Sequence, residues 1–210
     1  MLIKKMGQAA LLLMVFAVLG GGLVAFSFHN TAEQIKENER AALLRILNAL
    51  IPHEQYDNDL FHDVIKIPND AMLGTTEPVT IYRARQSGQS VAAVITTIVP
   101  DGYNGRIRLL VGINYEGILI GVRVVSHQET PGLGDKIELR RSDWILGFNG
   151  RSLTNPNATN WKVKQDGGIF DQFTGATITP RAIVKAVYKT LLFFRQSREK
   201  IFADPKNAQS

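Results

Sequence analysis

The segment "VTIYRARQSGQSVAAVITTIV" at residues 79–99 gives the strongest indication of the fold. β-Branched and aromatic residues recur through both of its halves, and Ser87, Gly88 and Gln89 separate them. Two such runs with turn-forming residues between them are typical of a β-hairpin. We therefore predict strands over 79–86 and 90–99, paired antiparallel.

The same pattern continues towards the C-terminus. "PDGYNG" at 100–105 is dense in turn residues, and the runs 106–114 and 117–127 read as two further strands. Apolar periodicity then predicts helices over 137–148 and 180–197. Because the strands come first and the helices follow, we expect an α+β domain, a mainly antiparallel sheet packed with helices, and not a doubly wound sheet.

Towards the N-terminus, the 23 residues 6–28 carry no charge. As a helix this run is about 34 Å long, which is enough to cross a hydrocarbon core of roughly 30 Å. The alternative is a cleavable signal peptide, but its apolar core is shorter and ends at small residues. Phe26 and Phe28 close this run instead. The sequence therefore predicts an uncleaved transmembrane helix.

Basic residues on the two sides of this helix predict its orientation. Lys4 and Lys5 precede the helix, whereas Lys36 and Arg40 on the far side are mixed with glutamates. Since basic residues favour the cytoplasmic side, we expect residues 1–5 in the cytoplasm and the main domain in the periplasm of a bacterium.

A stalk helix is predicted after the transmembrane helix. Thr31 and Gln34 have capping-box spacing, and Pro52 follows the end of an apolar stripe. The expected division of the chain is a cytoplasmic tail (1–5), a transmembrane helix (6–28), a stalk helix (29–52), a periplasmic domain (53–197) and a C-terminal tail (198–210).

Composition excludes several classes of function. The chain of 210 residues contains no cysteine, so disulfides and cysteine-ligated metal centres are impossible, and redox chemistry requires an organic cofactor or a partner's metal. The net charge of +5 is spread out, without a basic stripe among aromatic residues, so we expect no nucleic-acid binding. The four histidines show no metal-ligand spacing.

The segment "DQFTGATITPRAIVKAV" at 171–187 leads into the last predicted helix. Pro180 suits the first helical turn, where its missing N–H would be unpaired in any case. This placement predicts Thr179 as the N-cap. The N-terminus of such a helix offers unpaired N–H groups and partial positive charge, and both favour an anion.

Small and hydroxyl residues precede that helix. Gly175 and Ala176 allow a phosphate to approach the backbone closely, and Thr177 offers a hydroxyl beside it. The same pattern also suits an ordinary turn ahead of a helix. From these residues alone, a phosphate site is one of two open interpretations.

A second segment, "SHQETPGLGDKIE" at 126–138, follows the last predicted strand. In its simplest interpretation it is a strand-to-helix loop with a solvated pair of charges, His127 and Glu129. Alternatively, backbone amides exposed by Gly132 and Gly134 bind the edge of a flat heteroaromatic ring. The glycine spacing fits neither a P-loop nor a Rossmann fingerprint.

Several stretches together resemble one known family. "PDGYNGRIRLLVG", "HQETPGLGDKIELR", "KQDGGIFDQFTGATITPRAIV" and the N-terminal anchor resemble the G subunits of Rnf/Rsx ion-translocating electron transport complexes. The resemblance runs from the anchor to about residue 195 and implies an FMN-binding domain. In this family FMN is joined through its phosphate to the last threonine of an [S/T]-G-A-T motif, here Thr177. A dedicated transferase that uses FAD and needs magnesium makes the link.

The resemblance implies an electron-carrying flavoprotein subunit in the bacterial inner membrane. Its expected partners are the other subunits of a ferredoxin- and NAD-linked complex, including a second flavin-bearing membrane subunit. The expected FMN-binding residues are Thr177, which carries the covalent link, with Thr174, Gly175, Ala176, Thr179, Glu129, Thr130, Pro131, Gly132, Leu133 and Gly134. Two alternatives are a membrane-anchored sensor or adaptor that binds a phosphate-bearing ligand reversibly, and a structural subunit without flavin.

Overall fold

The N-terminal part of the chain is a single long helix. The computed structural model describes residues 2–68 and 70–203. Helix α1 spans Leu2–Leu50 without a break, so the predicted transmembrane and stalk segments lie on one helix. The capping box predicted at Thr31 does not form, because the Thr31 hydroxyl donates to the carbonyl of Ser27, one turn earlier, at 2.8 Å.

Among the described residues, helix α1 is long and apolar enough to cross a membrane. Large apolar side chains such as Leu13, Phe16 and Leu23 are exposed on it. Exposed apolar surface of this extent is costly in water and suits lipid. This fits single-pass membrane anchoring.

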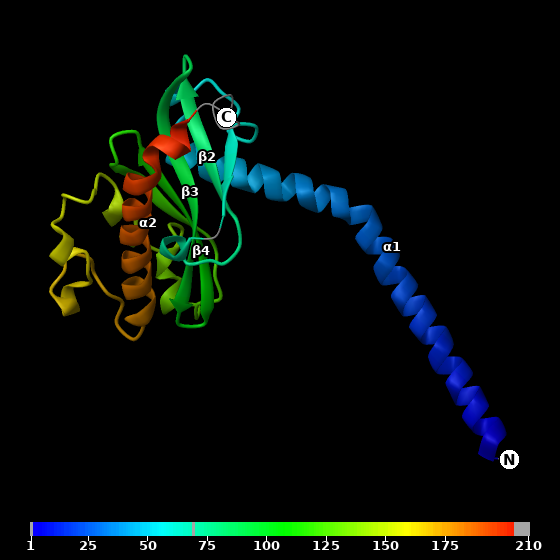
Figure 1. The fold of residues 1–210 in the computed structure, drawn as a ribbon. Helices are drawn as coiled ribbons and strands as arrows, with labels where there is room; N and C mark the ends of the chain where they lie inside the picture. Colours follow the sequence, from blue (N-terminus) through cyan, green and yellow to red (C-terminus); the bar gives the residue numbers. More distant parts are fainter. Residues whose placement is uncertain (1, 69, 204–210) are drawn as a thin grey trace. The chain divides into compact units, whose positions relative to one another are not determined.

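The chain divides between Arg45 and Ile46 into two compact units, and the second unit contains the sheet. Five antiparallel strands lie in the order of the sequence (Figure 1). The strands are β1 (Val64–Ile67), β2 (Val79–Gln86), β3 (Gln89–Gly102), β4 (Gly105–Asn114) and β5 (Leu119–Ser126). The predicted meander is therefore confirmed, and β1 adds an edge strand that the sequence analysis did not predict.

Two short turns set the register of the central strands. Ser87 and Gly88 join β2 to β3 with φ angles of 51° and 78°, the left-handed pair that a two-residue hairpin turn requires. At the other end of β3, Gly102 pairs with Gly105, so Tyr103 and Asn104 form the tip of the β3–β4 hairpin.

Helix α2 (Ile178–Phe202) packs against the sheet and runs alongside β3 (Figure 1). Ile183, Val187 and Leu191 face the core and are almost completely buried. Burying side chains of this size stabilises the fold by about 1.5–3 kcal/mol each.

The C-terminal end of α2 lies beyond the predicted limit of residue 197. Arg83 of β2 is buried there, and its Nη1 donates to the carbonyls of Ile201 (3.2 Å) and Ala203 (2.9 Å). These bonds satisfy carbonyls that have no partner within the helix. Residues 198–202 of the predicted tail are therefore helical, and residues 204–210 lie outside the described part of the chain.

The α-helix predicted over 137–148 is wrong. Two 3₁₀ helices, Gly134–Ile137 and Asp143–Phe148, occupy this region instead. The Ser142 hydroxyl accepts a hydrogen bond from the N–H of Trp144 at 3.2 Å, which starts the second helix separately. A serine side chain that bonds to a nearby backbone N–H competes with a continuous helix. The apolar residues recur at helical spacing because separate short turns bury them.

Candidate functional site

The two segments that the sequence analysis singled out lie together. The Thr179 hydroxyl in α2 donates to Oε2 of Glu129 in the loop after β5. A Cβ placed on Gly175 would lie 3.6 Å from Cδ2 of Leu133. The loop 129–134 and the start of α2 therefore form one site.

The helix start differs from the prediction. Thr177 is the residue before the helix, and Thr179 lies in the first turn with its side chain fully buried. The predicted N-cap at Thr179 is wrong because Glu129 takes its hydroxyl. Pro180 still lies in the first turn, where the helix needs no N–H from it.

Thr177 has an unusual position for a threonine at a helix start. Its backbone is already helical (φ −78°, ψ −22°), and its side chain makes no capping hydrogen bond. Within residues 2–68 and 70–203, the Thr177 hydroxyl has no hydrogen-bond partner, although threonine is a preferred capping residue at this position. The side chain is half-buried at the positive end of a helix of 25 residues.

The turn before α2 leaves the backbone accessible. Gly175 has a φ angle of 81°, which an L-residue with a side chain rarely adopts, and it is exposed. The N–H of Ala176 donates to the carbonyl of Phe173 at 3.1 Å and closes this turn. Thr174 is exposed at the outer side of the turn. An anion can therefore approach the start of α2 without displacing a side chain at residue 175.

Glu129 holds the site together from inside. Its side chain is only 4% exposed, and its Oε1 accepts from the N–H of Asn104 at 3.1 Å while Oε2 accepts from Thr179. A Cβ on Gly134 would lie 2.7 Å from Oε2, so only glycine leaves room there. The carboxylate thus joins the β3–β4 tip, the loop and α2.

The predicted solvated pair of His127 with Glu129 is wrong. His127 Nδ1 accepts from the Glu129 N–H (3.0 Å), and Nε2 lies 2.7 Å from Oε1 of Glu138. Because Nδ1 accepts, the ring proton is assigned to Nε2, which donates to Glu138. Hydrogen bonds from Arg140 and then from His127 lower the pKa of Glu138 below its ordinary value.

The amides expected to bind a ring edge are already engaged. The Gly132 N–H donates to Oδ1 of Asp135 at 2.8 Å, and the Gly134 N–H donates to the carbonyl of Thr130 at 3.0 Å. The Thr130 hydroxyl accepts from Nδ2 of Asn104 at 2.9 Å. The loop is therefore pre-formed, and the prediction that these two amides are available is wrong.

Large exposed side chains mark the outside of the same site. Tyr103, Leu133 and Ile178 are 65%, 44% and 47% exposed, and we call them the apolar rim. They come from the three segments that Glu129 joins. The sequence analysis missed Tyr103 and Asn104 because it treated residues 100–105 only as a turn. The signal that could have identified them is the tyrosine among polar residues in this turn.

Two family models match the chain. The model of the FMN-binding domain matches residues 102–192, which include the β3–β4 tip, the loop and the start of α2. The model of the RnfG N-terminal region matches residues 1–50, which correspond to α1.

Curated relatives cover nearly the whole chain. The chain is 52% identical over 203 residues to the G subunit of the ion-translocating oxidoreductase complex of Vibrio cholerae, covering 97% of this chain and 95% of the relative. The proteins of the same name from Pseudoalteromonas atlantica and Shewanella oneidensis are 50% identical over 200 residues and 48% identical over 207 residues. These alignments cover 95% and 99% of this chain and 93% and 98% of the relatives.

Proposed function

Since the chain belongs to the family of G subunits of ion-translocating oxidoreductase complexes, we propose that it carries FMN covalently, through a phosphoester to Thr177, and passes electrons within such a complex. The observation that carries this proposal is the Thr177 hydroxyl, which lies at the start of α2 without a hydrogen-bond partner in the described residues. A hydroxyl that neither caps the helix nor binds a neighbour is available for a covalent bond.

The surrounding residues fit an FMN phosphate. The first N–H groups of α2 and its partial positive charge favour a phosphodiester anion at this position. Gly175 keeps the approach free of a side chain. Of the three neighbouring threonines, Thr179 is buried and bonded to Glu129, and Thr174 lies outside the helix start, so Thr177 is the one suited to the link.

The apolar rim suits the isoalloxazine ring. Tyr103, Leu133 and Ile178 offer apolar surface from three segments, and a flat heteroaromatic ring is favoured against such surface. The bound FMN supplies the one- and two-electron chemistry, while the chain orients it and excludes water from one side. Of the loop residues expected to contact FMN, Leu133 is the one that this proposal keeps as a contact of the ring. The shape of the loop is then set by Thr130, Pro131, Gly132 and Gly134, and the buried Glu129 carboxylate fixes the loop to α2.

The link requires a balanced transfer reaction. The Thr177 oxygen attacks the FMN-side phosphorus of FAD, the phosphoanhydride bond breaks, and AMP leaves while the hydroxyl proton is lost. We assign this step to the FAD-dependent, magnesium-requiring transferase that the family resemblance implies. Because the product is covalent, the flavin is not lost by dissociation.

The proposed setting is a ferredoxin- and NAD-linked translocase. In it α1 anchors the protein in the bacterial inner membrane with residues 1–5 in the cytoplasm. Residues 53–197 then lie in the periplasm, and a second flavin-bearing membrane subunit exchanges electrons with this one. The isolated subunit is an electron carrier without turnover of its own.

A denaturing gel viewed under ultraviolet light tests the covalent flavin. The full chain is produced together with the transferase, and a fluorescent band near 23.3 kDa is expected for the wild type. Thr177→Val removes the band, whereas Thr174→Ser, a control that keeps a hydroxyl residue at the first position of the motif, retains it. A ligand that binds reversibly, as in a sensor or adaptor, would leave every band dark with an active transferase, and this would contradict the proposal.

A further inference from the structure

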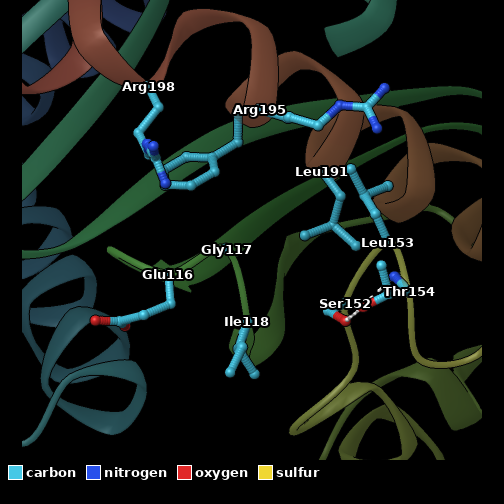
Figure 2. Close-up of a pocket in the computed structure, with 10 residues that line it drawn as sticks. Glu116, Gly117, Ile118, Ser152, Leu153, Thr154, Leu191, Arg195 and Arg198 are labelled. Atoms are coloured by element: carbon cyan, nitrogen blue, oxygen red, sulfur yellow. Dashed lines mark hydrogen bonds between the residues drawn. The ribbon is translucent and has the colours of Figure 1, made fainter.

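A second hollow lies on the C-terminal half of α2 (Figure 2). It has a volume of about 470 Å³, and helix α2 forms one side while the β4–β5 turn and residues 152–154 form the other. Leu191, the first α2 residue in its lining, comes 14 residues after Thr177, about 21 Å along the helix. The hollow is therefore separate from the candidate flavin site.

Two arginines stand at the edge of this hollow (Figure 2). Arg195 and Arg198 are exposed, and neither has a carboxylate within 4.0 Å in the part of the chain that the structure describes. Arg198 is held in place because its guanidinium lies 5.3 Å from the centre of the Tyr115 ring. Glu116 also lines the hollow, but its carboxylate points away from both arginines (Figure 2).

Apolar side chains form part of the lining of the hollow. Leu191 and Phe194 are buried in it, Leu153 lies beside Leu191, and Ile118, 40% exposed, comes from the β4–β5 turn (Figure 2). The hydroxyls nearest to them, on Ser152 and Thr154, are 3.1 Å apart and bond to one another. A ligand that fits this lining carries a carboxylate beside an apolar body.

We propose that this hollow docks an acidic residue of another subunit of the complex, flanked by apolar side chains. Arg195 and Arg198, whose guanidinium groups extend to opposite sides of the hollow, attract the carboxylate by charge, while its apolar neighbours cover Ile118 and Leu153 (Figure 2). A polypeptide is the favoured occupant because the chain's relatives are named as subunits of a complex, and because arginine beside a desolvated apolar base is typical of interface hot spots. The proposal rests on membership of the complex and not on the flavin.

Photo-crosslinking tests the occupant directly. A benzoylphenylalanine replaces Ile118 in the full chain within the assembled complex, and a matched probe replaces Lys66, an exposed residue of β1 outside the hollow. After irradiation, mass spectrometry should find Ile118 joined to a peptide of another subunit that contains Asp or Glu among apolar residues. Crosslinks to lipid, to the chain itself or to no subunit would overturn the proposal.

Charge reversal tests the two arginines. Arg195→Glu with Arg198→Glu should lower the yield of the Ile118 crosslink on the order of tenfold, because exposed charges at an interface control the rate of association and reversed charges repel the acidic partner. Lys66→Glu with Arg108→Glu changes the net charge equally at exposed sites outside the hollow and should leave the yield unchanged. Circular dichroism checks that both forms are folded. An equal yield in the folded Arg195/Arg198 variant would overturn the proposal.

The result of the crosslinking experiment does not depend on the flavin. The Arg195/Arg198 variant should keep the fluorescent band that depends on Thr177, because the two sites are separate. A chain that docks but stays dark with an active transferase would contradict only the flavin proposal, whereas a fluorescent chain that fails to crosslink would contradict only the docking proposal.

Discussion

Thr179, in the first turn of α2, donates a hydrogen bond to the carboxylate of Glu129, 50 residues earlier in the chain. Both side chains are buried, so the bond lies inside the protein. It fixes the start of α2 against the loop after β5. It also decides which threonine is engaged, since Thr179 is bonded and Thr177 stays available.

Thr179→Val should destabilise the C-terminal unit. The valine leaves the buried Glu129 oxygen without one of its donors, which costs about 1–3 kcal/mol. Urea unfolding of the full chain in detergent, followed by the fluorescence of Trp144 and Trp161, measures the loss. Thr179→Ser keeps the hydroxyl and is the control. A valine form as stable as the serine form would show that the hydrogen bond is unimportant.

Arg83→Met should destabilise the domain more strongly. Besides the α2 carbonyls, Arg83 binds Asp63 through Nε at 2.6 Å, and its guanidinium is buried. Asp63 keeps Arg85 as a partner, so the loss comes mainly from the carbonyls of Ile201 and Ala203, each of which loses a donor at a cost of about 1–3 kcal/mol. Arg85→Met is the comparison, because Arg85 also binds Asp63, at 2.9 Å, and is more exposed. We expect the smaller loss for Arg85; the opposite order in urea unfolding would contradict the assignment.

The hydrogen bonds of the Glu138 carboxylate predict acid sensitivity. Arg140 and His127 lower the pKa of the Glu138 carboxyl in the folded state, so the unfolded state takes up its proton first. The stabilisation is therefore present above the unfolded pKa of about 4.3 and is lost as the pH falls through the lower folded value.

Glu138→Gln removes this contribution. Its free energy of unfolding should fall less steeply than that of the wild type between about pH 5 and pH 3. Glu77→Gln, at an exposed position, is the control and should follow the wild type. If the free energy of unfolding of Glu138→Gln fell with pH as steeply as that of the wild type, ionisation of Glu138 would not contribute to stability.

The membrane orientation has a separate test. Alkaline phosphatase, which is active only in the periplasm, should be active when fused after Ser210, because Lys4 and Lys5 favour the cytoplasm for the N-terminus. A fusion of β-galactosidase at the same position, which works only in the cytoplasm, should be inactive. The reverse pair of results would overturn the predicted orientation.

The sequence predicted the sheet well because its signals are local. Strands β2 to β5 consist of β-branched runs separated by short turns such as Ser87-Gly88. β1 was missed because its four residues, Val64–Ile67, are too few for a recognisable alternation. The 137–148 region was predicted wrongly because Ile145 and Phe148 are buried by 3₁₀ turns whose spacing imitates a helix.

The site was predicted in part, and the errors have one cause. The segments around Thr177 and Leu133 were recognised from their composition, and the structure brings them together. The role of Glu129 depends on Asn104 and Thr179, which are 25 and 50 residues away, and no local pattern reveals bonds of that range. Sequence reasoning therefore identified the two segments that lie together but assigned the helix start to the wrong threonine.

The covalent link to Thr177 is tested by mass spectrometry of the tryptic peptide Gln165–Arg181 from the chain produced with the transferase. This peptide contains Thr174, Thr177 and Thr179, so fragmentation locates a modification on one of them. We predict the added mass of one FMN less one water, located on Thr177. An unmodified peptide with an active transferase, or the same mass on Thr174 or Thr179, would contradict the account.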